Sequence, residues 1–247
     1  MPTTGDVWYC IPSCNPKRAR EVTEAWREMG YRVAVLVDRN RLEDFIWGED
    51  APDLVVETHV YPGYYSAVNL LASLLLHKPL SLTQDGLIRR PAFGVRTTPS
   101  IVVTGGDDIF PDEKQGASEI RDTLYALRSD GWFVAQPIGD VVAMPGTDKI
   151  CGSPWFGRAW LERGYSGRGP FCSDYFQFYG DEELFNVAKL TGAYVALPDV
   201  TQRHEHYHRQ GGPEKTDYQA RNETHYWSRD QRVFFERQKK NWPGHKE

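Results

Sequence analysis

The segment VWYCIPSCNPKRAREVTEAWREMGYRVAVLVD, residues 7–38, has the clearest structural pattern in this chain. Its first apolar residues, 7–11, are rich in β-forming side chains and predict a strand that stops at Pro12. Residues 31–37 form a nearly continuous apolar run that ends at Asp38. Such a run is typical of a parallel strand that is covered on both faces of its sheet.

A helix is predicted between these two strands. Asn15 and Pro16 are residue types favoured at the N-cap and at the first helical position. Apolar residues at helical spacing follow, and Gly30 stands where a left-handed residue ends many helices. Because strand, helix and strand in succession form a right-handed βαβ unit, we expect an α/β fold with a mostly parallel central sheet flanked by helices.

The rest of the chain continues this alternation of elements. Strands are predicted at residues 54–56, 101–104, 132–135, 141–144 and 193–197, and helices at residues 63–77, 117–129 and within 176–190. A polar segment, residues 209–222, predicts a loop, and the capping-box pattern of Ser228 and Gln231 predicts the start of a final helix. We therefore expect a main domain over residues 1–206, with residues 207–247 forming a C-terminal loop and helix packed on it.

Composition limits the classes of function. The net charge of −5, from 29 Lys+Arg and 34 Asp+Glu, disfavours a non-specific nucleic-acid binder with a basic surface. The first residues show no secretory signal, and the aliphatic run at residues 70–76 is far shorter than the roughly 20 residues of a membrane span. Four cysteines without a CxxC pair favour free thiols over a zinc site. We expect a cytoplasmic protein without a membrane span.

Two adjacent carboxylates follow the predicted strand at residues 101–104. Asp107 and Asp108 come after Gly105 and Gly106, at the end of a strand where open α/β sheets bind ligands. The glycines would let a bulky group approach the backbone closely. Carboxylates suit Mg²⁺ or Mn²⁺, which neutralise a diphosphate. The alternative is a solvated acidic turn before a helix.

Three further groups of residues carry candidate chemistry. Asp181 and Glu182 start a predicted helix, where acids are also favoured by the helix dipole alone. His204 and His206 alternate along the chain, so on a strand both imidazoles could reach one Mn²⁺ ion. The basic residues of a Gly/Pro-containing loop, Arg89, Arg90 and Arg96, could clamp a diphosphate, although a solvated loop is an equal alternative.

A cluster of aromatic residues, Trp155, Phe156 and Trp160, allows two interpretations. Aromatic faces stack on sugars or bases, so these residues could form an acceptor platform. Core packing is the more frequent use of such side chains.

These segments together resemble nucleotide-sugar-dependent glycosyltransferases of the GT-A fold, of the family-two type. The likeness covers most of residues 7–206. It rests on the strand at residues 7–12, the strand ending at Asp38, the helix start at residues 63–69, and the segments at residues 106–108, 180–184 and 204–206.

The resemblance implies where a nucleotide-sugar donor would bind. Asp38 would hold the nucleotide base at the end of the second strand, beside Pro12 of the first. The family's Asp-x-Asp motif binds ribose and metal, but this chain has Gly106 in place of the first acid. Asp107 would therefore contact the donor, and Asp108 would bind the metal.

The resemblance also implies a metal shell and a catalytic base. His204 and His206 would complete the coordination of Mn²⁺ or Mg²⁺. In inverting members an acidic pair at this point deprotonates the acceptor hydroxyl, which implies Glu182 or Asp181, with Glu182 favoured as the second acid.

The expected function is metal-dependent transfer of a sugar, with inversion, from a nucleotide-sugar, a UDP-sugar in our interpretation, to a hydroxyl acceptor. The acceptor stays open among a glycan, a protein, a metabolite and, less favoured, a modified DNA base. One alternative is a nucleotidyltransferase of sugar phosphates, although residues 11–15 lack the Gly-rich loop usual in that class. Another is a non-catalytic module that binds nucleotides or carbohydrates.

Overall fold

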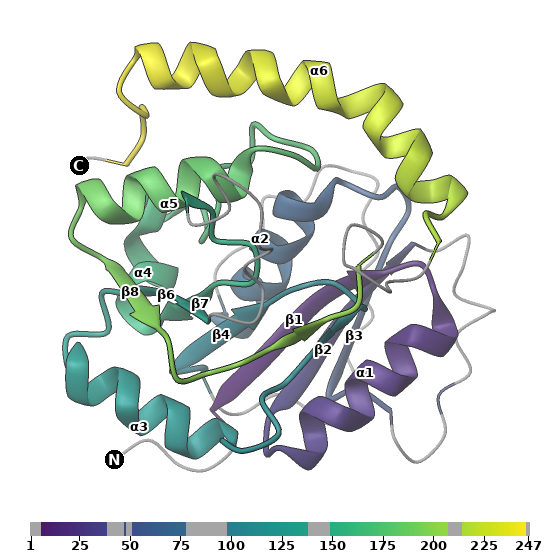
Figure 1. Ribbon diagram of the computed structural model, residues 1–247, viewed down its shortest axis with the longest axis vertical. Helices are drawn as coiled ribbons and strands as arrows, with labels where there is room; N and C mark the ends of the chain where they lie inside the picture. The colour runs from purple at the N-terminus through teal and green to yellow at the C-terminus, as the bar shows by residue number, and fades with distance from the viewer. Residues whose placement is uncertain are drawn as a thin grey trace.

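The computed structural model describes residues 6–38, 47, 51–77, 98–137, 149–206 and 214–245. Its centre is a seven-stranded sheet in the order β3-β2-β1-β4-β7-β6-β8 (Figure 1). The strands are β1 (Val7–Ser13), β2 (Arg32–Asp38), β3 (Leu54–Thr58), β4 (Ile101–Thr104), β6 (Val134–Pro137), β7 (Trp155–Gly157) and β8 (Tyr194–Leu197). Each neighbouring pair is parallel except those of β7, which is antiparallel to β4 and β6. The predicted α/β fold with a mostly parallel sheet is confirmed.

The first strand is longer than predicted, because it continues through Pro12 to Ser13. Pro12 pairs with Leu36 of β2, whereas the pairing of β1 with β4 ends at Cys10. Proline is tolerated where one side of a strand is unpaired, because no ladder hydrogen bond from its nitrogen is then lost. The prediction that Pro12 stops the strand was therefore wrong.

Helices cover both faces of the sheet. On one face, Tyr9 and Ile11 of β1 pack in a core with side chains of α1 (Pro16–Glu28) and α3 (Ala117–Leu127). On the other, Trp8 and Cys10 pack with α2 (Tyr64–Leu75), α4 (Arg158–Arg163) and α5 (Gly180–Leu190). Alternate residues of a strand point to opposite faces, so one apolar strand supplies both cores.

The start and end of α1 follow the predicted signals. The Asn15 side chain accepts a hydrogen bond from the backbone N–H of Arg18 at 3.2 Å, and Pro16 is the first helical residue. Gly30 adopts φ 84°, in the left-handed region that side-chain-bearing residues avoid. The helix ends there and the chain turns into β2.

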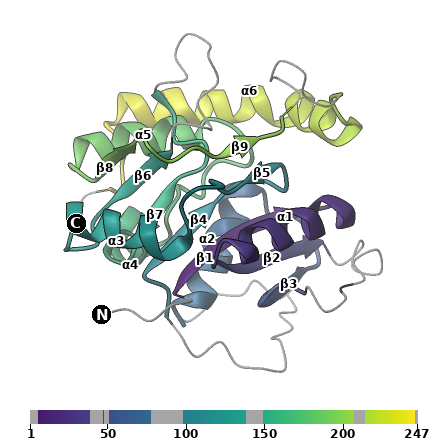
Figure 2. The same ribbon diagram turned by 60° about the horizontal axis from the view of Figure 1, so that its bottom comes forward.

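A second, small sheet lies beside the main one (Figure 2). It consists of β5 (Ile109–Phe110) and β9 (Arg203–His204), which are antiparallel, with Ile109 opposite His204. This pairing brings the segment after β4 against the segment after β8, although about a hundred residues separate them in sequence.

The last helix, α6 (Asp217–Lys239), begins earlier than predicted. Its capping box consists of Thr216, whose hydroxyl accepts from the N–H of Gln219 at 3.2 Å, and Gln219, whose side chain accepts from the N–H of Thr216 at 2.9 Å. Ser228 is an exposed residue within the helix. The prediction that the helix starts at Ser228 was wrong. The same spacing of a hydroxyl residue and Gln occurs earlier, at Thr216 and Gln219, and residues 217–222 of the predicted loop are helical.

Burial settles two other expectations. Trp155, Phe156 and Trp160 are at most 1% exposed, so they belong to the core and form no platform. All four cysteines are free, as expected, and three of them are buried.

The predicted strand at residues 141–144 and the loop with Arg89, Arg90 and Arg96 lie outside the described residues. None of the described helices combines the length and the apolar character needed to cross a membrane.

Candidate functional site

The candidate site lies at the carboxyl ends of β1 and β4. From β1 the chain adds β2 and β3 on one side, and β4 then joins β1 on the other side. In open parallel sheets such a reversal opens a crevice in which ligands bind. Ser13 ends β1, and its hydroxyl donates a short hydrogen bond to the Asp107 carboxylate, which follows β4. The two strands thus place polar side chains together at this point.

Two aromatic side chains form hydrogen bonds to the backbone of the turn after β4. The Tyr9 hydroxyl donates to the carbonyl of Gly106 at 2.7 Å, and the Trp26 indole N–H donates to the carbonyl of Ile109 at 2.8 Å. The Tyr9 and Trp26 rings are stacked, with centroids 3.9 Å apart. Because Trp26 is fully buried in the core, these hydrogen bonds attach the acidic turn to a rigid part of the protein.

The two glycines of this turn make room for the protein itself. A Cβ on Gly105 would lie 2.7 Å from the Tyr9 hydroxyl oxygen. A Cβ on Gly106 would overlap the carboxylate of Asp108. The expectation that these glycines admit a bulky ligand is therefore replaced by a different finding: they let the turn close on Tyr9 and Asp108.

Asp107 is a partly buried acid. Burial raises the pKa of its carboxyl to about 6, although the hydrogen bond from Ser13 and the charge of Arg18 act in the opposite direction. The neighbouring Asp108 charge adds to the rise. A carboxylate in this position is an acceptor for hydroxyl groups, as its contact with Ser13 shows.

Asp108 lies against the histidine segment. Its carboxylate oxygen is 3.4 Å from Nε2 of His204, and its backbone carbonyl accepts from the N–H of Glu205 at 2.8 Å. Burial alone would raise the pKa of the Asp108 carboxyl, but the hydrogen bond and charge of His204, with His206 and Arg18, hold it below its ordinary value. The sequence could name Asp108 and His204 by residue type, and the pairing of β5 with β9 brings them together.

The residues present fit a divalent cation as partial ligands. The Asp108 carboxylate and the His204 imidazole are close, and the ring of His206 lies 5.2 Å from that of His204. Within the described ranges, no three His, Cys, Asp or Glu side chains are grouped so that they could hold a metal ion. Oxygen and imidazole donors suit Mn²⁺, and such ions are often held by one or two protein side chains together with substrate phosphates.

Asp38 and Pro12 lie at the same edge of the sheet. Ser13 is opposite Val37, so Asp38 is the residue just beyond that pair, at the end of β2. Pro12 precedes Ser13, and both Pro12 and Asp38 are partly exposed. The structure thus places these two predicted donor contacts on the strands next to Asp107.

The start of α5 is connected to the end of β4 through hydrogen bonds of an intervening segment. The Tyr65 hydroxyl of α2 accepts from the N–H of Gly180 at 3.0 Å and donates to the Asp181 carboxylate at 3.3 Å. The Asp181 carbonyl accepts from the N–H of Cys151 at 3.1 Å, and three residues later the Pro154 carbonyl accepts from the N–H of Thr104 at 3.1 Å. The short segment from Cys151 to Pro154 therefore links the start of α5 to the end of β4.

Glu182 is half-buried on the first turn of α5. Burial, and then the charge of Asp181, raise the pKa of the Glu182 carboxyl to about 7. An acid with a pKa near the working pH is well suited to take up a proton, because it is partly ionised yet strongly basic. Asp181, by contrast, is tied to Tyr65, which leaves Glu182 as the better candidate base.

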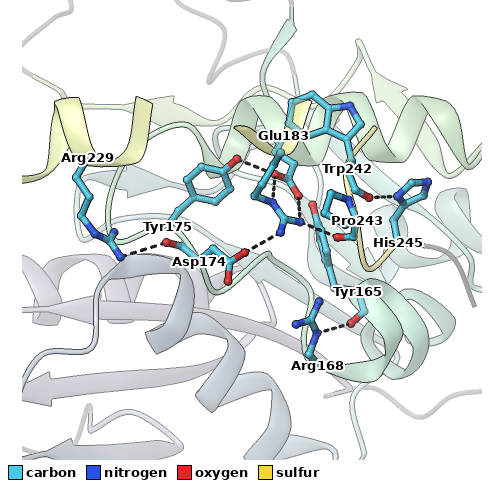
Figure 3. A network of polar contacts seen from close by, with 10 residues as sticks. Tyr165, Arg168, Asp174, Tyr175, Glu183, Arg229, Trp242, Pro243 and His245 are labelled. Atoms are coloured by element: carbon cyan, nitrogen blue, oxygen red, sulfur yellow. Dashed lines mark hydrogen bonds and ion pairs between the residues drawn. The ribbon is translucent and has the colours of Figure 1, made fainter. Parts of the chain in front are cut away.

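Glu183, the third acid of this run, has a structural role that the sequence did not reveal. It is fully buried and receives hydrogen bonds from Nε and Nη2 of Arg237 at 2.7 and 2.8 Å and from the Tyr175 hydroxyl at 2.7 Å (Figure 3). Arg237 also donates to Asp174 at 2.7 Å. Since Arg237 stands 54 residues later, no local pattern could have predicted the pair.

Asp230 is a second buried anchor from α6. Its carboxylate, with no exposed surface, accepts from the backbone N–H groups of Phe176, Gln177 and Phe178 at 2.8–3.1 Å. These residues lead directly into α5. Asp230 and Arg237 therefore hold α6 on the segment that carries the candidate base, and Figures 1 and 2 show α6 running beside α5.

Two comparisons with known proteins gave no relative. A scan against models of protein families found no match for this chain, and a search of curated proteins found none either. Function is therefore inferred from the geometry and chemistry of these residues.

Proposed function

We propose that this protein is a metal-dependent glycosyltransferase that transfers a sugar from a UDP-sugar to a hydroxyl acceptor, with inversion at the anomeric carbon. The observation that carries the proposal is the contact of Asp108 with His204 at the carboxyl end of β4, where the sheet order reverses. A sheet with one antiparallel strand, β7, among parallel ones is compatible with a GT-A fold.

The donor would lie across the ends of β2, β1 and β4. Asp38 accepts a hydrogen bond from the base N–H, and Asp107 accepts from a ribose hydroxyl, as it does from Ser13. Asp108, with His204 and His206, would hold Mn²⁺ or Mg²⁺. When bound, this cation neutralises the diphosphate leaving group.

The acceptor would bind with one of its hydroxyl groups next to Glu182. The oxygen of that hydroxyl group forms the new bond to the anomeric carbon while the bond from that carbon to the diphosphate oxygen breaks. The hydroxyl proton passes to the Glu182 carboxylate, and UDP leaves with the electron pair of the broken bond. A positioned base is needed because a free hydroxyl group holds its proton tightly at neutral pH.

The function is tested by incubating the full chain with a panel of nucleotide-sugars and Mn²⁺ and measuring release of the free nucleotide. We expect slow hydrolysis of a UDP-sugar, with water in place of the acceptor, and its loss in EDTA. Release of pyrophosphate from a nucleoside triphosphate and a sugar 1-phosphate would instead indicate a nucleotidyltransferase. Binding of the nucleotide-sugar without any turnover would indicate a binding module.

A further inference from the structure

Three segments that are distant in sequence bring aromatic rings together around the start of α5. The Phe176 ring is stacked on Tyr226 of α6, with centroids 3.9 Å apart, and Tyr61 meets Phe176 edge-on at 5.8 Å. Trp227 of α6 contacts Phe178 and Tyr179 edge-on, both at 5.1 Å. We call this group the aromatic shelf; its members are Tyr61, Phe176, Phe178, Tyr179, Tyr226 and Trp227.

The shelf is only partly covered by the protein. Trp227 is 46% exposed, and the other five rings are partly exposed rather than buried. Exposed Trp side chains present a large apolar face at low entropic cost, which makes them frequent sites of ligand contact. The shelf therefore offers surface for stacking, unlike the buried aromatic core around Trp155.

The shelf is also rigid. Asp230 fixes the backbone of residues 176–178, and the Phe176 carbonyl accepts from the N–H of Tyr64 at 2.7 Å. The Tyr179 hydroxyl accepts from the side-chain N–H of Gln231 at 2.8 Å. A surface that is ordered before binding loses little entropy when a ligand arrives.

The shelf adjoins the candidate base. Tyr179 is the N-cap residue of α5, and the two acids Asp181 and Glu182 follow it in the first turn. Burial, and the charge of Glu182, raise the pKa of the Tyr179 phenol. Tyr179 has φ 67°, in the left-handed region, and such strained residues concentrate at functional sites.

We propose that the aromatic shelf binds the sugar ring of an uncharged carbohydrate acceptor, with Trp227 as its stacking face and an acceptor hydroxyl directed toward Glu182. Only the second part of this proposal, the direction of the acceptor hydroxyl toward Glu182, rests on the proposed function. A sugar ring has an apolar C–H face that an aromatic ring can cover, and its hydroxyl groups can donate to Asp181 and Glu182. The same carboxylates disfavour the phosphates of a nucleic acid, because like charges repel across an interface.

The test measures binding of neutral oligosaccharides to the full chain without donor or metal. The probes are cello-, malto- and chito-oligosaccharides, with a single-stranded DNA oligonucleotide as the competing class, each measured by calorimetry. We expect at least one saccharide to bind, Trp227→Ala to weaken its binding about tenfold, and Trp227→Phe to restore most of the affinity. Rescue by phenylalanine separates lost stacking from a damaged fold.

Phe235→Ala is the matched control. Phe235 is 49% exposed on the same helix, and its ring packs on Phe234 outside the shelf. This variant should bind the saccharide as the wild type does. Equal binding by wild type and Trp227→Ala, binding of the oligonucleotide alone, or no binding of any probe would overturn the proposal. Nucleotide release from UDP-sugars is measured separately, so failure of the transferase activity leaves this binding result independent.

Discussion

Replacing Arg237 by methionine tests how α6 is held on the segment that carries the candidate base. Arg237 donates two hydrogen bonds to Glu183, one to Asp174 and one to the Pro243 carbonyl, within 2.7–2.9 Å. Methionine keeps much of the apolar stem but leaves the fully buried Glu183 carboxylate with the Tyr175 hydroxyl as its remaining named partner. Breaking a buried ion pair costs about 3–5 kcal/mol, a large part of the roughly 5–15 kcal/mol that stabilises a typical domain.

A double-mutant cycle in urea, followed by circular dichroism, measures this cost. Arg237→Met should lower the free energy of unfolding by about 3–5 kcal/mol. Combining it with Glu183→Gln should recover part of that loss, because no unpaired carboxylate is then buried, with a coupling of about 1–3 kcal/mol. A loss below about 1 kcal/mol for Arg237→Met, or a double variant whose loss equals the sum of the singles, would refute the account of this anchor.

Variants of three residues of the proposed site give further predictions. Asp108→Asn should lower turnover a hundredfold or more in assays with Mn²⁺, and EDTA should abolish wild-type turnover; full activity in EDTA would exclude the metal role. Asp38→Ala should raise the donor KM with a smaller effect on kcat in steady-state kinetics, and an unchanged KM would exclude a contact with the base. Glu182→Gln should lower kcat about 10²–10⁴-fold and remove a rise of the wild-type rate with pH through about 7, the pKa to which burial raises this carboxyl. The pKa of Glu182 in the folded protein exceeds its ordinary value of 4.5, so ionisation of this carboxyl lowers the stability of the fold as pH rises from about 4.5 to about 7. In thermal melts, Glu182→Gln should lack this decrease in stability.

Local signals in the sequence were enough for the main sheet. Asn15 acts through its own side chain and Gly30 through its own backbone conformation, and the apolar run before Asp38 indicates burial on both faces. Each signal lies within a few residues of the structure that it determines. The prediction that Pro12 ends the first strand was wrong because the effect of a proline depends on which side of β1 is paired, and that is a property of the assembled sheet.

The candidate site could be named in part but not assembled. Asp108 and His204 stood out by residue type and position after strands, yet the two-residue strands β5 and β9 that join them are too short to leave a pattern. The pairing of Glu183 with Arg237 left no local signal either. Contacts between distant segments follow from the packing of the whole chain, which one sequence does not display.

Metal-dependent binding of UDP tests the central claim most directly. Titration of the full chain with UDP in Mn²⁺ and in EDTA is followed by calorimetry for wild type, Asp108→Asn and the control Glu113→Gln, an exposed acid five residues further along. We predict that UDP binds wild type and Glu113→Gln only in Mn²⁺, and that Asp108→Asn weakens binding at least about tenfold. Equal UDP affinity in EDTA, equal affinity of Asp108→Asn, or no binding to the wild type would contradict the assignment of this edge of the sheet as a nucleotide-diphosphate site.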